Sequence, residues 1–196
     1  SGFRDSCYLV DTCATLGKDV TSVLDMGCSS GRVIRHFAAQ GDYLVYGADI
    51  NWNSIRWVQK YLSPSIIPFQ NTSVPHLPIP DGCLSLVTAF SVFTHIECFE
   101  MAWMMELARV LEPGGIAFIT IKSEDTLKNM RPDWITYHGL KAHPDFKEEM
   151  MGSEMKEDKL VFRYRGNTSY SSQVFLHTNY IQNVFGRIFD IVKIDR

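Results

Sequence analysis

Between residues 21 and 121 the sequence alternates short runs of β-branched and apolar residues with stretches that repeat at helical spacing. This alternation is typical of a parallel sheet wound with crossover helices, because each helix returns the chain to the same end of the sheet. We therefore predict an α/β fold with a doubly wound, mostly parallel sheet. The predicted strands are residues 22–26, 43–48, 66–69, 84–90 and 115–121.

Helical patterns lie between and before these strands. Residues 31–39 and 54–62 have helical spacing, and an apolar stripe that includes Trp103 continues until Pro113 and two glycines end it. We expect this stripe to lie in the core, since aromatic residues at helical spacing usually pack. We also predict an N-terminal helix over about residues 5–16.

The pattern changes after residue 122. Residues 122–172 mix proline, glycine and charges of both signs, as in an inserted arm that covers a substrate. We predict a hairpin from residues 160–164 and 172–176 around Gly166-Asn167, a short helix at 179–185 and a strand at 189–194. We interpret residues 1–196 as one domain, with a ligand-binding core at 21–121 and the arm at 122–172.

Composition and charge exclude several classes of protein. The 196 residues carry 19 Lys and Arg against 22 Asp and Glu, a net charge of −3, without the basic cluster that nucleic-acid binding needs. The longest apolar run is far too short to span a membrane. The five cysteines fit neither a zinc spacing nor a disulfide framework, so we expect reduced thiols in a cytoplasmic protein and no bound metal.

The most informative segment is a strand that runs directly into a loop of small residues, VLDMGCSSGR at 23–32. At the carboxyl edge of a parallel sheet, such a loop lets a ligand approach bare backbone. Asp49 follows Gly27 by 22 residues, at the end of the second predicted strand, where a carboxylate accepts hydrogen bonds from ribose hydroxyls. Together these features indicate an adenosine-type ligand.

The loop also indicates the charge of the ligand. A pyrophosphate needs the unopposed N–H groups that the later glycines of a GxGxxG loop provide, and here those positions hold Ser29 and Arg32. Asp25, just before the loop, would repel a diphosphate but would attract a ligand that carries an ammonium and a sulfonium. The sequence therefore favours S-adenosylmethionine over a dinucleotide.

From about residue 22 to residue 120 the sequence resembles the class I S-adenosylmethionine-dependent methyltransferases. The resemblance includes HLPIPDG at 76–82 and ELARVLEPGG at 106–115, in the family's order. It implies that residues 25–31 hold the methionine half of the cofactor, that Asp49 holds the ribose, and that the segment after the third strand recognises the adenine. The cofactor-binding candidates are Asp25, Gly27, Cys28, Ser29, Gly31, Asp49, Ile50, Thr72, Ser73, Ser91 and Phe93.

Two residues depart from the family pattern. Ser29 stands in place of a glycine in the loop, and serine is compatible with this position if its backbone dihedrals are ordinary. Ser85 stands where an aspartate usually opens the fourth strand, and we expect this to change only local hydrogen bonding. Because the family's sheet usually ends with an antiparallel seventh strand, we also expect the chain to be truncated before that strand.

The segment from Ser91 to Ile96 resembles the subset of the family that acts on small molecules or sugars, and it lacks the tetrapeptide that marks methylation of exocyclic or amide nitrogens. A hydroxyl acceptor would benefit from a base, and His95 and His177 are the catalytic candidates; His138 and His143 lie in the arm, where a solvated loop is the simpler interpretation. We predict methyl transfer to a small-molecule acceptor such as a sugar or another hydroxyl compound. The alternative is a catalytically silent module that binds the cofactor or a partner.

Overall fold

The computed structural model describes residues 2–164 and 172–195. The chain divides into two compact units. Unit 1 contains residues 2–92 and Ala102–Ile119, and unit 2 contains Phe93–Met101 and residues from Thr120 onward.

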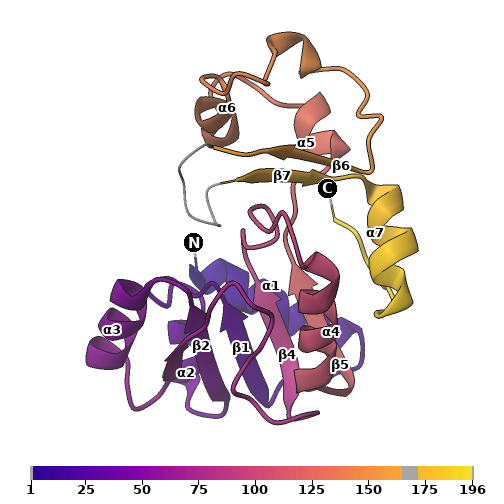
Figure 1. Cartoon of the computed structure of the whole chain (residues 1–196). Coiled ribbons are helices and arrows are strands. Elements are labelled where there is room, and N and C mark those ends of the chain that lie inside the picture. The colour runs from indigo at the N-terminus through magenta and orange to yellow at the C-terminus, as the bar shows by residue number, and fades with distance from the viewer. Residues whose placement is uncertain (1, 165–171, 196) are drawn as a thin grey trace. The chain divides into compact units, whose positions relative to one another are not determined.

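Unit 1 is built on a five-stranded parallel sheet with the strand order β3-β2-β1-β4-β5 (Figure 1). Its strands are β1 (Ser22–Met26), β2 (Leu44–Asp49), β3 (Ile67–Gln70), β4 (Leu84–Ala89) and β5 (Leu111–Ile119). Its helices are α1 (Gly2–Thr15), α2 (Ile34–Gln40), α3 (Trp52–Tyr61) and α4 (Glu100–Val110), whose first two residues belong to unit 2. The predicted fold class is confirmed.

Burial follows the position of each strand in the sheet. Every residue of β1 and β4 is buried, as expected for central strands covered on both faces. β5, in contrast, lies at the edge of this sheet, and most of its residues are only partly buried. Ser85 accepts hydrogen bonds from the N–H groups of Thr21 and Ser22, so it joins the starts of β1 and β4.

Unit 2 has its own apolar core and a separate two-stranded antiparallel sheet, formed by β6 (Lys159–Phe162) and β7 (Gln173–Leu176). The predicted pairing is confirmed, while Gly166-Asn167 lies outside the described residues. The helical elements are α5 (Glu124–Lys128), α6 (Ile135–Leu140), η1 (Glu148–Met150), α7 (Thr178–Val184) and η2 (Phe185–Arg187). Of these, α5, α6 and η1 contribute residues to a core that includes Leu127, Phe146, Phe162 and Phe175.

The strand predicted at residues 189–194 is wrong. These residues form no strand, and Val192 is 65% exposed. Alternating apolar residues form a strand only where a second strand satisfies their backbone groups, and within the described residues of unit 2 none pairs with this segment.

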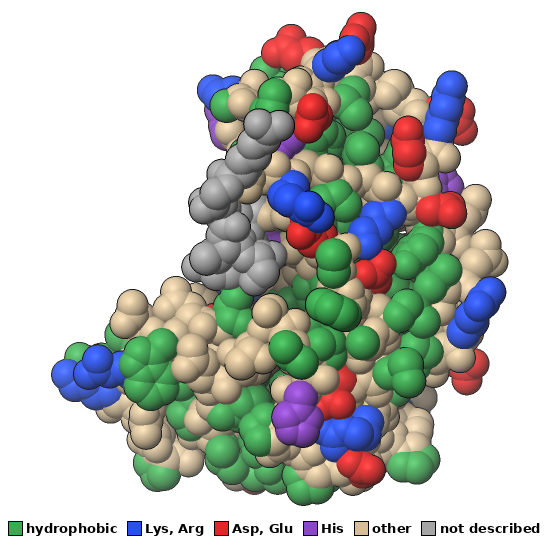
Figure 2. Space-filling model, viewed as in Figure 1, with side chains coloured by type: hydrophobic (Ala, Val, Ile, Leu, Met, Phe, Trp, Pro, Cys, Tyr) green, Lys and Arg blue, Asp and Glu red, His purple; other side chains and the backbone are tan. Residues whose placement is uncertain are grey.

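Charged side chains of both signs are interspersed on the face shown in Figure 2, without a large patch of one sign. Of the helices formed by residues 2–164 and 172–195, none combines the length and the apolar character that crossing a membrane requires.

Candidate functional site

The loop between β1 and α2 turns sharply at the carboxyl edge of the sheet. Gly27 and Gly31 have φ values of +76° and +71°, in the left-handed region that favours glycine. A Cβ on Gly27 would lie 2.4 Å from Cγ2 of Val92, so a side chain is excluded there by space as well as by backbone conformation. Cys28, Ser29 and Ser30 form the loop between these two glycines.

Ser29 does not have the ordinary dihedrals that serine would prefer. Its φ is +48°, which costs an L-residue about 1–2 kcal/mol. The conformation directs its N–H toward β2, where it donates a hydrogen bond of 2.8 Å to Oδ2 of Asp49. The backbone of Ser29 therefore has a left-handed conformation that glycine adopts easily, and in serine this conformation is strained.

Replacing Ser29 with glycine should relieve this strain. Glycine keeps the N–H that Asp49 accepts but carries its own entropic cost of about 0.5–1 kcal/mol, so we expect Ser29→Gly to stabilise unit 1 by about 0.5–1 kcal/mol. Urea unfolding should show a higher midpoint with an unchanged slope. Ser30→Gly, a neighbouring change at a residue without positive φ, should give no gain; equal gains from both would contradict the strain at Ser29.

Asp49 organises this edge of the sheet. Its Oδ2 accepts the Ser29 N–H at 2.8 Å, and its Oδ1 accepts the Asn51 N–H at 2.7 Å, at the start of α3. The side chain is half-buried, so each oxygen retains a lone pair for a further donor. Ile50, the adjacent candidate, is half-buried, and its carbonyl accepts a hydrogen bond from Gln70 at 3.0 Å.

Asp25 occupies a more buried position near the end of β1. It is 2% exposed, and its Oδ1 accepts a 2.8 Å hydrogen bond from Oγ1 of Thr88 on β4. Burial raises the pKa of Asp25 to about 7, against the opposing effects of the Thr88 hydrogen bond and the Arg32 charge. The carboxyl group therefore presents almost no surface to solvent.

Cys28 is also buried, which raises the pKa of its thiol with a further contribution from the charges of Asp25 and Asp49. The thiol therefore stays protonated. It packs close to Gly47 on β2, where an added Cβ would lie 3.2 Å from the sulfur, so it contributes to the packing under the loop.

The end of β3 carries a residue that sequence reasoning missed. Asn71 is 6% exposed; its amide nitrogen donates to the Thr72 carbonyl at 3.3 Å, while its Oδ1 is buried without a hydrogen-bond partner in the described residues. A buried acceptor without a donor costs about 1–3 kcal/mol, so this oxygen fits a ligand N–H. The candidate Thr72 instead uses its hydroxyl in a local turn with Val74, and Ser73 is exposed.

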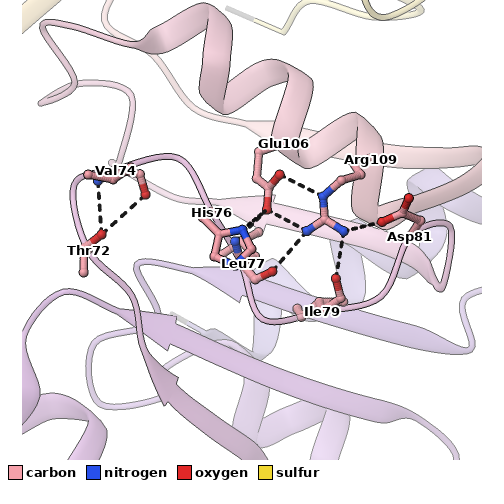
Figure 3. Close-up of polar contacts among 8 residues, drawn as sticks. All are labelled: Thr72, Val74, His76, Leu77, Ile79, Asp81, Glu106 and Arg109. Carbon is pink, nitrogen blue, oxygen red and sulfur yellow. Dashed lines mark hydrogen bonds and ion pairs between the residues drawn. The ribbon is translucent and has the colours of Figure 1, made fainter.

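A network on α4 holds the loop that follows Asn71 (Figure 3). Oε1 of Glu106 accepts the Leu77 N–H at 2.6 Å, and Arg109 donates to the carbonyls of Leu77 and Ile79 at 3.0 and 2.9 Å. Arg109 also pairs with Glu106 and Asp81, and its hydrogen bond is the largest effect lowering the pKa of Glu106. The segments HLPIPDG (76–82) and ELARVLEPGG (106–115) are therefore held together by direct contacts.

The candidates that follow β4 are divided between the two units. Ser91, with a φ of +57°, belongs to unit 1, whereas Phe93 and His95 belong to unit 2. Phe93 is 1% exposed and packs edge-on against Phe185, with 6.4 Å between ring centroids. Within its unit, Phe93 is a core residue.

His95 has a defined proton arrangement. Its Nδ1 lies 2.7 Å from the carbonyl oxygen of Ser172, and because a carbonyl only accepts, Nδ1 carries the proton and Nε2 has the lone pair. Burial, the largest effect, lowers the pKa of His95, and the Lys122 charge lowers it further against the Ser172 contact. The neutral ring can therefore accept a proton at Nε2. Ser172 is itself fixed, because its hydroxyl donates to Glu97 at 2.9 Å.

The other histidines have local structural contacts. Nδ1 of His177 accepts the Asn179 N–H at 3.1 Å and caps α7. His143 is 4% exposed, donates from Nε2 to the Arg163 carbonyl at 3.0 Å and packs between two aromatic rings. His138 lies on α6 beside Tyr137. Of the two catalytic candidates, His177 uses its lone-pair nitrogen, Nδ1, in the cap of α7, whereas the lone-pair nitrogen of His95, Nε2, makes no hydrogen bond with the described residues.

Comparison with known families identifies the core of unit 1. A family model described as a methyltransferase domain matches residues 24–119, the span from β1 to the end of β5. The match covers 96 of the 196 residues. The match supports the predicted cofactor, S-adenosylmethionine, and the matched span contains both loop glycines, Asp25, Asp49 and Asn71. A comparison with curated proteins finds no match at the sequence level.

Solved structures share the fold of this part of the chain. DesVI from Streptomyces venezuelae is 21% identical, with a TM-score of 0.52 over 60% of this chain and 50% of its own. CalS10, a SAM-bound amino pentose methyltransferase from Micromonospora echinaspora, is 18% identical, with a TM-score of 0.52 over 61% of this chain and 50% of its own. The cyclase SpnF is 21% identical, with a TM-score of 0.50 over 60% of this chain and 45% of its own. The match thus spans about half the length of these proteins or less.

Proposed function

We propose that the protein transfers the methyl group of S-adenosylmethionine to a small-molecule acceptor with a hydroxyl group. The observation that carries the proposal is the unpartnered, buried Oδ1 of Asn71 at the strand edge where Asp49 also lies. A nucleoside offers ribose hydroxyls and, for adenosine, an exocyclic amine, which match a half-buried carboxylate and an acceptor without a donor. Asp49 and Asn71 would bind these two parts, and the backbone around Gly27 would hold the methionine half.

The bound cofactor supplies an activated methyl group on a sulfonium. The protein contributes alignment and charge placement, because methyl transfer is an in-line displacement in which the positive charge disperses. The field of Asp25 would stabilise the bound cation. His95 would accept the hydroxyl proton at Nε2, while Glu97 and Ser172 hold its ring in the required orientation.

The proposal for a sugar-like or other small acceptor has support from one solved structure. CalS10, which shares the fold, is named for an amino pentose substrate. SpnF, which also shares the fold, is named as a cyclase. This fold therefore also occurs in a protein named for another reaction, which supports testing the second candidate, a module without methyl transfer activity.

The role of Asn71 can be tested with a pair of ligands that differ at one group. S-Adenosylhomocysteine carries the exocyclic amine, and S-inosylhomocysteine carries an oxygen in its place. We expect the wild-type protein to prefer the adenosyl compound by about tenfold, because the oxygen would face Oδ1 of Asn71. Asn71→Leu should remove the preference in calorimetric titrations. Asn53→Leu, a change at an exposed residue of α3, should retain it; a preference that survives in Asn71→Leu would contradict the assignment.

The overall proposal is tested in two steps. Calorimetry should show binding of S-adenosylhomocysteine, and its absence at millimolar ligand would remove the proposal. A screen of hydroxyl compounds with cofactor labelled on the methyl group should then transfer label to one chemical class. Binding without transfer to any acceptor in the screen would favour the catalytically silent module.

A further inference from the structure

Lys122, two residues after Thr120 in unit 2, is a half-buried cation with neutral neighbours. Its ammonium donates a hydrogen bond to Oε1 of Gln173 and lies 5.9 Å from the ring centroid of Phe175. Burial lowers the pKa of Lys122 to about 8. Lys122 belongs to no ion pair within the described part of unit 2, residues 93–101, 120–164 and 172–195. Lys159, by contrast, pairs with Glu100 at 2.7 Å.

Lys122 and His95 both lie along one edge of β7. The Thr94 carbonyl accepts the Val174 N–H at 2.9 Å, and the Lys122 carbonyl accepts the Leu176 N–H at 2.8 Å. Backbone groups of alternate residues point to one edge of a strand, so Ser172, Val174 and Leu176 form this edge. The ring of His95 contacts Ser172 there. The two side chains therefore belong to one cluster, close enough for the Lys122 charge to affect His95.

A structural role does not account for the ammonium group. The backbone of Lys122 already connects it to β7, and an apolar side chain could pack against Phe175 as well as the lysine stem does. Among the described residues, the partners of this partly buried charge are one amide oxygen and one aromatic ring. These neutral groups stabilise the ammonium less than the hydration that it loses on burial. Two N–H donors of the ammonium are not used by Gln173 and fit an anionic group.

We propose that Lys122 and His95 form an acceptor subsite in which Lys122 binds a carboxylate or phosphate of the acceptor. The inference rests on the proposed function and narrows its substrate class to hydroxy acids and phosphorylated alcohols. In this role, Nε2 of His95 would take the proton as the hydroxyl O–H bond breaks. The cofactor, when bound, would supply the methyl group that the oxygen receives, and the electron pair of the C–S bond would remain on its sulfur.

Nuclear magnetic resonance of the full chain tests the subsite without a known acceptor. Lysine side-chain signals and the ring signals of His95 are followed during titration with sodium acetate and, separately, inorganic phosphate, against sodium chloride at equal ionic strength. We expect a saturable shift of Lys122 and His95 with at least one of the two anions, and the anion that produces it identifies the acidic group. Lys159, whose charge is already paired, should respond as it does to chloride.

A matched variant completes the test. Lys122→Met keeps the length and packing of the side chain, and we expect it to weaken the anion response at His95 by about tenfold or more. The inference is overturned if both anions act only as chloride does in the wild-type protein, or if Lys122→Met leaves the response unchanged. S-Adenosylhomocysteine binding is measured on the same samples, so loss of the anion response with intact nucleoside binding rejects the subsite and leaves the proposed function standing.

Discussion

Replacing Asp25 with asparagine is expected to make the protein more stable at neutral and alkaline pH while weakening its binding of S-adenosylmethionine. Burial raises the pKa of Asp25 to about 7, whereas an unfolded aspartate titrates near ~3.9. Between these values the folded state keeps a proton that the unfolded state has lost, so stability falls as pH rises toward about 7 and is level above it. Asparagine avoids this loss and can still accept the Thr88 hydrogen bond.

The expected size of the effect follows from linkage. From about pH 5 to about pH 8 the wild-type protein should lose about 2–3 kcal/mol relative to Asp25→Asn, since each pKa unit corresponds to about 1.4 kcal/mol. Urea unfolding at the two pH values measures the difference. Asp42→Asn, a change at an exposed carboxylate, is the control and should follow the wild-type protein. A difference between Asp25→Asn and wild type that is equal at both pH values would contradict the assignment.

The affinity for S-adenosylmethionine should rise with pH over the range in which the stability of the wild-type protein falls. A cationic ligand favours the ionised form of Asp25, so the wild-type affinity for S-adenosylmethionine should increase as pH rises toward about 7. In Asp25→Asn this pH dependence should disappear, and the affinity at about pH 8 should be lower by about tenfold. Calorimetric titration across the pH range measures both. The stability that the wild-type protein gives up at Asp25 is, on this view, a cost of holding a positively charged ligand.

The periodic parts of the sequence predicted the fold well. β1 has the predicted bounds, and the other parallel strands overlap their predicted ranges, because continuous apolar runs between helical segments leave few alternatives to a covered parallel sheet. Residues 189–194 have an equally good strand pattern but no strand beside them. An alternating pattern of apolar residues identifies a segment that could form a β-strand. Whether it pairs with another strand depends on residues far away in the chain.

The site was predicted less completely, for physical reasons that differ between residues. The φ of Ser29 depends on an acceptor 20 residues away, Oδ2 of Asp49, and sequence reasoning had no access to that contact. Asn71 looks like an ordinary turn residue after a strand, and only its burial and its unpartnered oxygen distinguish it. Lys122 was not singled out because a lysine after a strand is usually solvated. Burial and missing partners are properties of the folded chain.

Asp49→Ala should have the largest effect on nucleoside binding. The two oxygens of Asp49 accept hydrogen bonds from the N–H groups of Ser29 and Asn51, so alanine removes the support of a strained loop residue together with the carboxylate proposed to bind the ribose. Each lost hydrogen bond to a charged group costs about 1.5–3 kcal/mol, so we expect affinity for S-adenosylhomocysteine to fall by about 100-fold or more. Asp42→Ala, at an exposed position, should leave the affinity unchanged in the same calorimetric titrations.

Loop support and ribose recognition can be separated with a second ligand pair. Adenosine and 2′,3′-dideoxyadenosine differ in the ribose hydroxyls, while loop order affects the binding of both. If Asp49 accepts these hydroxyls, wild-type protein should prefer adenosine and Asp49→Ala should bind the two almost equally, as in a double-mutant cycle. If Asp49 only supports Ser29, both ligands should weaken in parallel and the preference should remain. The second outcome would reassign Asp49 from ligand binding to loop support, and the nucleoside assignment would then rest on Asn71.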